Sequence, residues 1–502
     1  MVRSRAPGSV ESMSALSLRR PDLPILRLPA PQPTEIRTGR RLLRSVATLF
    51  TAVLLVLAAA CTSANNAGPP PFYVSPSGNG TNGLSWATAW RDTSLIDWSV
   101  IRPGAKIIID GGRSTCSVSP YDFRSSSPDP GIACGERYHP FSIGQNDITI
   151  ERSAAAGHDG TVVIDGGRDT PLPYCGQARY PAVTKASAGI DLNGHSDVTI
   201  NGMTRSGIVV RGAQNGIVMR DGGHDKLVNM EIVDNGFAVA HSWGYSSDGN
   251  GVLMGGRDNV YDRLLVHDNG QDEFHSDSSG YDESGSALYN SWLGAVRTHP
   301  RYPDEPFNDL QNSGHDPGCT HADGMQIFAP GTTMSGLTFN YDVFGPGTNT
   351  GLYPSDGGTG TTFDDVTIKN SLFLSAASTD ILSDTRVHGW DLSHDTIIAF
   401  HGALGLPGNG GNTMTSVIKC GGYVFTPGGS WNTSGNVWYG GDPLPGKAVH
   451  LDPGFSGIPT NPAGLRVAKF TPAAKGGSPL HSWSALLERI DSLNSHIEPF
   501  PS

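Results

Sequence analysis

Three polar residues that can transfer protons or hold a ligand fall within six positions of one another. They are His321, Asp323 and Gln326, in the stretch THADGMQIF that begins at Thr320. An imidazole exchanges protons near neutral pH, and a carboxylate beside it can orient the ring, bind a cation or transfer a proton itself. Because residues two apart in an extended strand share a face, His321 and Asp323 can point the same way. The competing interpretation is a polar turn, since Asp before Gly and His near a turn commonly bond the backbone.

An acidic run earlier in the chain offers oxygen ligands for a cation. Asp272, Glu273 and Asp277 belong to the segment QDEFHSDSSGYDESG, and oxygen ligands at this density suit Ca²⁺. Their spacing is not that of an EF-hand, so a solvated acidic loop is the favoured alternative. His275, His299 and His315 are further histidines of the same region.

The composition indicates which elements position these side chains. The chain has 502 residues, of which 65 are Gly and 36 are Pro, and the glycines are spread along the sequence. Because Gly reaches positive φ at little cost, this distribution is typical of many short strands joined by tight turns. The formal net charge is −12. A surface of this sign repels nucleic acid, so nucleic acid is not expected as a partner.

A repeat of about thirty residues organises the middle of the chain. Each segment opens with a polar or small residue, continues with Gly in all but the last, and then places an aliphatic residue before a second short strand. The aliphatic residues are Ile190, Ile217, Val252, Met325, Leu352 and Ile381. In this alignment Asp323 takes the position of Asn250 and Thr350. Gln326 stands where other segments have Val or Leu, and a buried Gln would need hydrogen-bond partners, so we expect it to point outward.

One step of the repeat is far longer than the others. The second strands start near residues 197, 229, 263, 336, 365 and 394, so the step after 263 contains an extra coil, an insertion or both. We interpret residues 271–320 as a loop that leaves the coil. Long ordered loops on a rigid scaffold often carry function, and surface decoration is the alternative.

Short strands at a fixed period indicate a solenoid whose coils stack and pair in parallel. The repeats contain no amphipathic helical stretch, which disfavours tandem βα units. The stretch FYVSPSGNGTNGLSWATAWRDTSLIDWSVIRPGAKIIIDGG from Phe72 resembles the opening of secreted bacterial right-handed parallel β-helix proteins of the pectin-lyase-like superfamily. The stretch LDPGFSGIPTNPAGLRVAKFTPAAKGGSPL from Leu451 resembles their closing segment. We therefore expect an all-β chain, folded as a single-stranded right-handed parallel β-helix with short capping helices.

The expected organisation has four parts. They are an N-terminal extension with an export signal at residues 1–61, a linker at 62–71, the β-helix at 72–455, and a closing segment with a C-terminal amphipathic helix at 456–502. The open ends of a β-helix need covers, and residues 93–101 are the candidate for the N-terminal capping helix.

The start of the chain indicates an extracytoplasmic location. Arginines precede the apolar run SVATLFTAVLLVLAAAC, which is too short to span a membrane comfortably and is typical of an export signal. Its end resembles a bacterial lipobox, so Cys61 is a candidate lipidation site, with ordinary cleavage as the alternative. We expect a secreted or cell-surface protein, attached to the membrane only through this signal or a lipid. Export favours disulfides, and Cys116 with Cys134 is the easiest pair.

The resemblance implies a carbohydrate-active protein, although this fold hosts lyases, hydrolases, epimerases and adhesins. A lyase acting on a uronate polysaccharide must neutralise a carboxylate, remove a proton and protonate the leaving oxygen. Arg297 or Ca²⁺ is the candidate neutralising group, and His321 is the candidate base. A glycoside hydrolase that pairs Asp323 with Asp316 or Asp356 is the first alternative. The second is a non-catalytic carbohydrate-binding or adhesin-like protein.

Several side chains are candidates for holding the polysaccharide. Arg301 can pair with a uronate carboxylate. Trp292 can offer a face for sugar stacking, or it can pack within the loop. Gln326, Tyr353 and Asp356 can line the same groove. We favour an enzyme, with a lyase ahead of a hydrolase, and we expect a monomer with no cofactor other than Ca²⁺.

Overall fold

The computed structural model describes part of the chain, and the described residues all belong to one compact unit, Ala67–Ser502. They are residues 69–113, 135–167, 186–204, 206–241, 244–276, 282–294, 298–299, 302–306, 323–328, 331, 333–345, 348–355, 362–374, 379–383, 387–399, 402–408, 410–425, 430–446 and 448–450. In this part of the chain, no helix is both long enough and apolar enough to cross a membrane.

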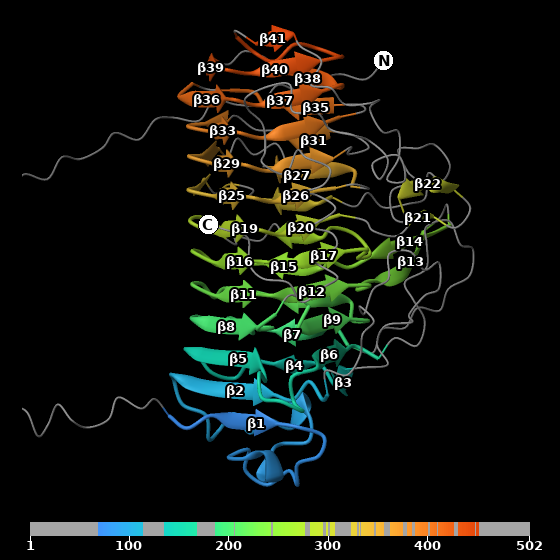
Figure 1. Ribbon diagram of the computed structural model, residues 1–502, viewed down its shortest axis with the longest axis vertical. Helices are drawn as coiled ribbons and strands as arrows, with labels where there is room; N and C mark the ends of the chain where they lie inside the picture. Colours follow the sequence, from blue (N-terminus) through green and yellow to red (C-terminus); the bar gives the residue numbers. More distant parts are fainter. Residues whose placement is uncertain are drawn as a thin grey trace, which may run out of the picture. The chain divides into compact units, whose positions relative to one another are not determined.

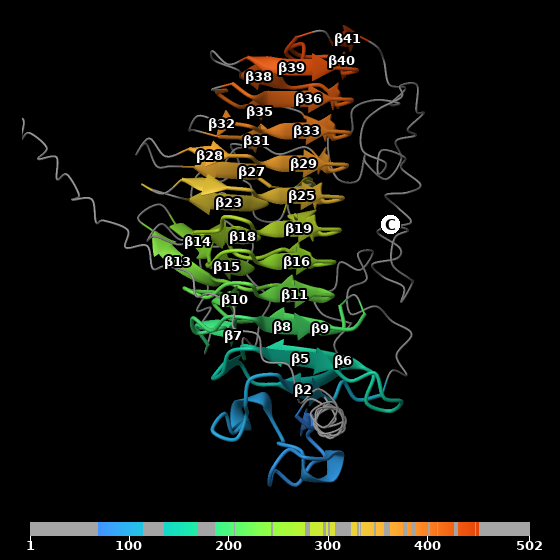
Figure 2. The ribbon, with the colours of Figure 1, turned by 90° about the vertical axis from the view of Figure 1, so that its left-hand side faces the viewer.

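Three long sheets run side by side along the stack, and every strand pairing within them is parallel (Figure 1). We call them sheets A, B and C. Sheet A is the sheet that faces the viewer in Figure 2, where its strands lie one above another. Its strands, in order across the sheet, are β1 (Phe72–Val74), β2 (Ala105–Ile109), β5 (Ile148–Arg152), β8 (Val198–Asn201), β11 (Lys226–Val228), β16 (Val260–Asp262), β19 (Ala287–Tyr289), β25 (Thr338–Asn340), β29 (Thr367–Lys369), β33 (Asp391–Ser393), β36 (Asn412–Thr415) and β39 (Trp431–Ser434).

Sheets B and C complete each coil. The strands of sheet B are β3 (Gly135–Tyr138), β6 (Thr161–Asp165), β9 (Ile208–Arg211), β12 (Met230–Val233), β17 (Leu265–His267), β20 (Trp292–Leu293), β26 (Val343–Phe344), β30 (Leu372–Leu374), β34 (Thr396–Ile398), β37 (Ile418–Cys420), β40 (Val437–Tyr439) and β41 (Val449–His450). The strands of sheet C are β4 (Phe141–Ser142), β7 (Ala188–Asp191), β10 (Asn215–Val218), β15 (Val252–Met254), β18 (Phe274–Ser276), β23 (Met325–Phe328), β27 (Thr350–Ser355), β31 (Thr379–Leu382), β35 (Gly402–Gly405) and β38 (Tyr423–Phe425). The chain visits A, B and C in turn, so the predicted parallel β-helix is confirmed.

The interior is a continuous apolar column. In sheet C the predicted aliphatic positions align in register, Ile217 with Val252 and Met325 with Leu352. All six of these residues, from Ile190 to Ile381, are buried, as the sequence pattern predicts. Burying an aliphatic side chain of this size contributes roughly 1.5–3 kcal/mol, and no single coil could bury its inner face without its neighbours.

The bend between sheets A and B uses one left-handed residue in coil after coil. Asn229, Asn290 and Asn370 occupy it with φ of 58°, 52° and 54°. Asn tolerates this conformation better than most residues, because its short side chain can hydrogen-bond locally. Asn229 also donates from Nδ2 to Oδ1 of Asn201 one coil below, at 3.0 Å.

Part of the loop predicted at residues 271–320 is instead a complete coil. Residues 274–293 form β18, β19 and β20, which pair in register with the coil before them. The excursion from the stack therefore follows Leu293, and its described part is the antiparallel hairpin of β21 (Thr298–His299) and β22 (Tyr302–Pro306). The long step in the repeat thus contains both an extra coil and an insertion.

The remaining elements are short. A second antiparallel hairpin joins β13 (Phe237–His241) and β14 (Gly244–Asp248), and a small parallel sheet contains β24 (Met334–Ser335), β28 (Phe363–Asp364) and β32 (Val387–His388). Two 3-10 turns, η1 (Trp86–Thr88) and η2 (Thr93–Leu95), precede β2. The capping helix predicted at 93–101 is therefore only a 3-10 turn, although Ile96 and Ile101 are still buried against the core. The predicted C-terminal helix lies outside the described residues.

Candidate functional site

Three polar side chains lie side by side on the outer face of sheet C. Phe274 points into the core, so His275, the next residue of β18, points outward. His275 pairs in register with Gln326, and Gln326 pairs with Tyr353. Strands of a sheet lie about 4.8 Å apart, so the three side chains span two strand spacings. We call His275, Gln326 and Tyr353 the outer triplet; all three are half-buried.

Asp272 holds the ring of His275. Its Oδ2 lies 2.7 Å from Nδ1 of His275, and its carboxylate is fully buried whereas the imidazole is 19% exposed. Oδ1 of the same carboxylate accepts a hydrogen bond from the backbone N–H of Asp323 at 2.8 Å. An ionised Asp272 can only accept a hydrogen bond, and in that state it favours the tautomer with the proton on Nδ1 and the lone pair on Nε2. This arrangement suits a general base.

A ladder of side chains connects Asp272 to the neighbouring coils. In each step a side-chain oxygen accepts from the backbone N–H of the next coil. Oδ1 of Asn215 accepts from the N–H of Asn250 at 2.9 Å, and Oδ1 of Asn250 accepts from the N–H of Asp272 at 3.3 Å. Asp323 continues the ladder by accepting from the N–H of Thr350 at 2.8 Å. These bonds satisfy backbone donors at the turn that leads into sheet C, where water is excluded.

Asp323 is therefore a rung of this ladder in the structure. Its side chain is fully buried, and Oδ1 accepts from Nδ2 of Asn349 at 3.1 Å as well as from Thr350. This is the position that the repeat alignment assigned, but the carboxylate faces the neighbouring coil instead of an exposed edge. Gln326 does lie on the outer face, as its position in the repeat predicts.

Other predicted site residues separate from the outer triplet. Trp292 belongs to β20 in sheet B, is 7% exposed, and donates from Nε1 to the carbonyl oxygen of Gly345 at 2.7 Å. Its ring is packed, which leaves no open face for a sugar. Outside the described residues lie His321, Arg297, Arg301, Asp356 and Asp277, together with Cys61, Cys116 and Cys134.

The two described members of the predicted Ca²⁺ site bond to different partners. Asp272 contacts His275 and the Asp323 backbone, whereas Oε2 of Glu273 accepts from Nδ2 of Asn269 at 2.5 Å. Glu273 stands in register with Gly324, one coil above, at a position that faces the interior. Within the described ranges, no three His, Cys, Asp or Glu side chains are grouped to hold a metal ion.

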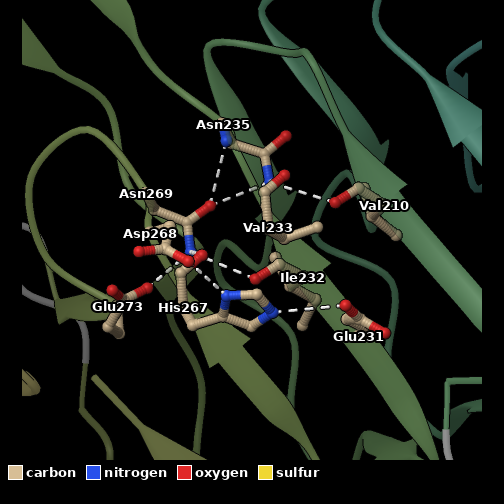
Figure 3. Close-up of polar contacts among 9 residues, drawn as sticks. All are labelled: Val210, Glu231, Ile232, Val233, Asn235, His267, Asp268, Asn269 and Glu273. Carbon is tan, nitrogen blue, oxygen red and sulfur yellow. Dashed lines mark hydrogen bonds and ion pairs between the residues drawn. The ribbon is translucent and has the colours of Figure 1, made fainter. Parts of the chain in front are cut away.

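A second group of ionisable side chains is buried under the outer face of sheet B (Figure 3). His267 lies between two carboxylates, with Nδ1 2.7 Å from Oδ2 of Asp268 and Nε2 3.2 Å from Oε1 of Glu231. Burial alone would lower the pKa of His267, but the hydrogen bonds and charges of Asp268 and Glu231 raise it to about 9. Burial raises the pKa of the nearby Glu273 to about 8. All four side chains are shut off from solvent, so this buried polar group bears on stability and cannot touch a substrate.

Comparison with known proteins gives likenesses of fold only. No protein-family model matches the chain, and no curated protein matches it. Among solved structures it is similar to pectate lyase Pel9A, with 13% identity, 82% of this chain and 90% of the other covered, and a TM-score of 0.40. It is also similar to a rhamnogalacturonan lyase, with 11% identity, coverage of 73% and 84%, and a TM-score of 0.38. A third is PfbA, a surface adhesin of Streptococcus pneumoniae, with 8% identity, coverage of 68% and 79%, and a TM-score of 0.35.

Proposed function

We propose that this protein is a carbohydrate-active β-helix enzyme that cleaves a uronate-containing polysaccharide by β-elimination on the outer face of sheet C. The observation that carries the proposal is the imidazole of His275, oriented by the buried carboxylate of Asp272 and flanked in register by Gln326 and Tyr353. We also propose that the segment up to Cys61 exports the protein, which would place the activity outside the cytoplasm, with lipidation at Cys61 and ordinary cleavage as the two alternatives.

The outer triplet offers groups for each proton movement of the reaction. Nε2 of His275 accepts the proton from C5 of the uronate, the freed electron pair forms the C4–C5 double bond, and the bond from C4 to the leaving oxygen breaks. The leaving oxygen then takes a proton, for which the phenol of Tyr353 is the acid in the same row. Gln326, between them, can hydrogen-bond sugar hydroxyls through both ends of its amide. We assign neutralisation of the uronate carboxylate to Arg297, Arg301 or a bound Ca²⁺.

The described part of this face favours proton transfer by histidine over a pair of carboxylates. A glycoside hydrolase needs two carboxyl groups about 5–9.5 Å apart, one on each side of the bond to be cleaved. Asp323, one member of the predicted pair, is buried and engaged by the backbone of Thr350. Hydrolysis and binding without cleavage remain the alternatives that experiment must separate.

A panel of uronate and neutral polysaccharides tests the proposal on the full mature chain. New ultraviolet absorbance from an unsaturated uronate identifies a lyase, and reducing ends without it identify a hydrolase. Binding with neither product supports the adhesin-like alternative. We expect the absorbance.

The site is tested by His275→Asn, which keeps a donor for Asp272 but has no nitrogen that accepts a proton. The rate should fall by about 10²–10⁴-fold, the range of a lost general base. The matched control is His139→Asn, because Nδ1 of His139 also lies 2.9 Å from a carboxylate oxygen, Oδ2 of Asp92. His139 is exposed and precedes β4, four strand spacings or about 19 Å from β18. Equal activity of the two variants would exclude His275 as the base.

A further inference from the structure

We propose that a pocket at the N-terminal end of sheet C binds an uncharged sugar residue, as a site separate from the outer triplet. The pocket has a volume of about 420 Å³. Ligand sites for small molecules typically measure about 300–1,000 Å³, so it can take one or two sugar rings. Three segments build its walls, namely the turn around η2, strand β4 and strand β7. Nothing in the proposed elimination reaction requires this pocket.

The lining combines an aromatic surface with hydroxyl groups. Trp98 supplies a half-buried ring, Phe141 closes the floor from the core, and Ser94, Ser142 and Ser187 supply hydroxyls. A sugar ring presents apolar C–H groups on its faces and hydroxyls around its edge, so this mixture of side chains suits it. A purely apolar ligand would displace water from the exposed hydroxyls of Ser142 and Ser187 without replacing its hydrogen bonds, which is unfavourable.

The charge of the pocket selects among sugars. Asp191 is the one ionisable residue of the lining, which contains no Lys, Arg or His. Its Oδ1 accepts from the backbone N–H of Asn193 at 2.8 Å, which orients the carboxylate so that Oδ2 can accept from sugar hydroxyls. A uronate, sulfate or phosphate would meet this negative charge with no cation to offset it. The pocket therefore suits an uncharged sugar better than the acidic one assigned to the outer triplet.

Two sets of contacts hold the walls of the pocket in place. Trp98 sits against Gly144, where a Cβ would come within 2.5 Å of the indole Cγ, so the ring is held closely against the backbone. Ser94 donates from both its backbone N–H and its hydroxyl to Oδ1 of Asp92, at 2.8 and 2.6 Å. Walls that need little reordering lose little entropy when a ligand binds.

The pocket and the outer triplet lie on the same row of sheet C but do not merge. Ser142 pairs with Asp191, Asp191 with Val218, Val218 with Leu253, and Leu253 with His275. Val218 and Leu253 are buried, so the two polar regions are separated by covered apolar positions. About 14 Å, or three strand spacings, lies between β7 and β18.

Equilibrium binding of neutral mono- and oligosaccharides to the full chain, followed by calorimetry and by ligand-observed NMR, tests the pocket. Galacturonic acid and glucosamine are included as the anionic and cationic comparisons. Ser142→Phe fills the pocket from an exposed outward position, so it leaves the core intact. Ser434→Phe makes the same change at an exposed position of β39, outside the pocket. Asp191→Asn keeps the acceptor for Asn193 and removes the charge.

We expect saturable binding of a neutral saccharide, which Ser142→Phe abolishes and Ser434→Phe leaves unchanged. Asp191→Asn should weaken this binding on the order of tenfold, because a hydrogen bond to a charged group is replaced by a neutral one. Binding should persist in His275→Asn, which separates this site from the proposed reaction. The inference is overturned if no neutral saccharide binds saturably, if Ser142→Phe binds as well as wild type, or if an acidic or cationic sugar is preferred.

Discussion

The carboxylate of Asp272 links the imidazole of His275 to the backbone of the next coil. Oδ2 lies 2.7 Å from Nδ1 of His275, and Oδ1 accepts the N–H of Asp323 at 2.8 Å. The ring orientation is therefore tied to the stacking of β18 on β23, and a structural ladder serves at the same time as the support of a candidate base. Asp272→Asn can separate these roles, because Asn preserves the bond from the backbone of Asp323 and changes the bond to His275.

Asp272→Asn should inactivate the proposed base while leaving the fold in place. The amide oxygen of Asn can still accept from Asp323, but its NH₂ group would face Nδ1 of His275 as a donor. Nδ1 must then accept, and the ring proton moves to Nε2, which can no longer take a proton from the substrate. We expect kcat/KM to fall by about 10²–10⁴-fold with little change in thermal unfolding. Nitrogen NMR of His275 reports the tautomer directly, and an unchanged tautomer would contradict this account.

Asp323 can be tested in the same manner, because Asn occupies the same ladder position in two earlier coils, at Asn215 and Asn250. Asp323→Ala should destabilise the fold by about 1–3 kcal/mol, since the buried N–H of Thr350 loses its acceptor. Asp323→Asn keeps the acceptor, so both stability and activity should stay near wild type. Thermal unfolding and turnover of the two variants decide the role. A stable but inactive Asp323→Asn would instead support the catalytic role predicted from the sequence.

The repeat in the sequence predicted most of sheet C because it has a steric origin. A Cβ on Gly251 would come within 2.6 Å of the carbonyl oxygen of Glu273, so Gly precedes the inward aliphatic residue in most coils. The coil that contains β18 breaks this pattern, since Asp272 and Glu273 stand where other coils have a polar residue and Gly. Glu273 is accommodated because Nδ2 of Asn269 meets its carboxylate. That substitution hid the coil and made residues 271–293 look like a loop.

The candidate site was harder to predict for a different reason. The sequence places Gln326 and Tyr353 at groove positions through their places in the repeat, and it shows His275 only as a further histidine of the region. His275 joins them only through strand pairing with Gln326, across an insertion whose length says nothing about register. Asp272, the carboxylate partner of His275, is also evident in the sequence. An acidic run whose strand register is unknown, however, predicts a solvated surface as readily as a ladder of buried side chains.

The buried His267 predicts a loss of stability at alkaline pH. Its pKa of about 9 in the folded chain exceeds the ordinary value of 6.5, so the folded state binds the proton more tightly than the unfolded state. The resulting stabilisation is complete below about pH 6.5 and is lost as the pH rises through about 9. A shift of this size corresponds to about 3 kcal/mol. Thermal unfolding midpoints should fall over this range.

His267→Gln provides the comparison for that prediction. It leaves Glu231 and Asp268 buried without a cation, so the variant should be less stable than wild type at neutral pH. Its unfolding midpoint should depend less on pH between about 6.5 and 9, because the titrating group is gone. A pH dependence equal to that of wild type would show that another group is responsible.

Glu273 should add a loss of stability that begins at lower pH than that of His267, and Glu273→Gln isolates its share. Burial raises the pKa of Glu273 from its ordinary value of 4.5 to about 8, so the folded state holds a neutral carboxyl near pH 7. Stability then falls as the pH rises from about 4.5 through 8, because the unfolded chain ionises first. Gln has nearly the shape of the neutral carboxyl, can accept from Nδ2 of Asn269, and cannot ionise. The variant should match wild type near pH 5 and exceed it by roughly 3–5 kcal/mol above pH 8.

Two features make the Glu273→Gln result decisive. The sign is unusual, since the variant gains stability at alkaline pH although it replaces a buried residue at a hydrogen-bonded position. Glu151→Gln, on the outer face of sheet A where Lys106 lies 3.1 Å away, makes the same chemical change on the surface and serves as the control. Because a surface ion pair contributes only about 0–1 kcal/mol, the control should shift the unfolding midpoint little at either pH. If Glu273→Gln were destabilising above pH 8, the Glu273 carboxylate would have to be ionised in the folded protein. Because this side chain faces the interior, a cation would then have to lie beside it.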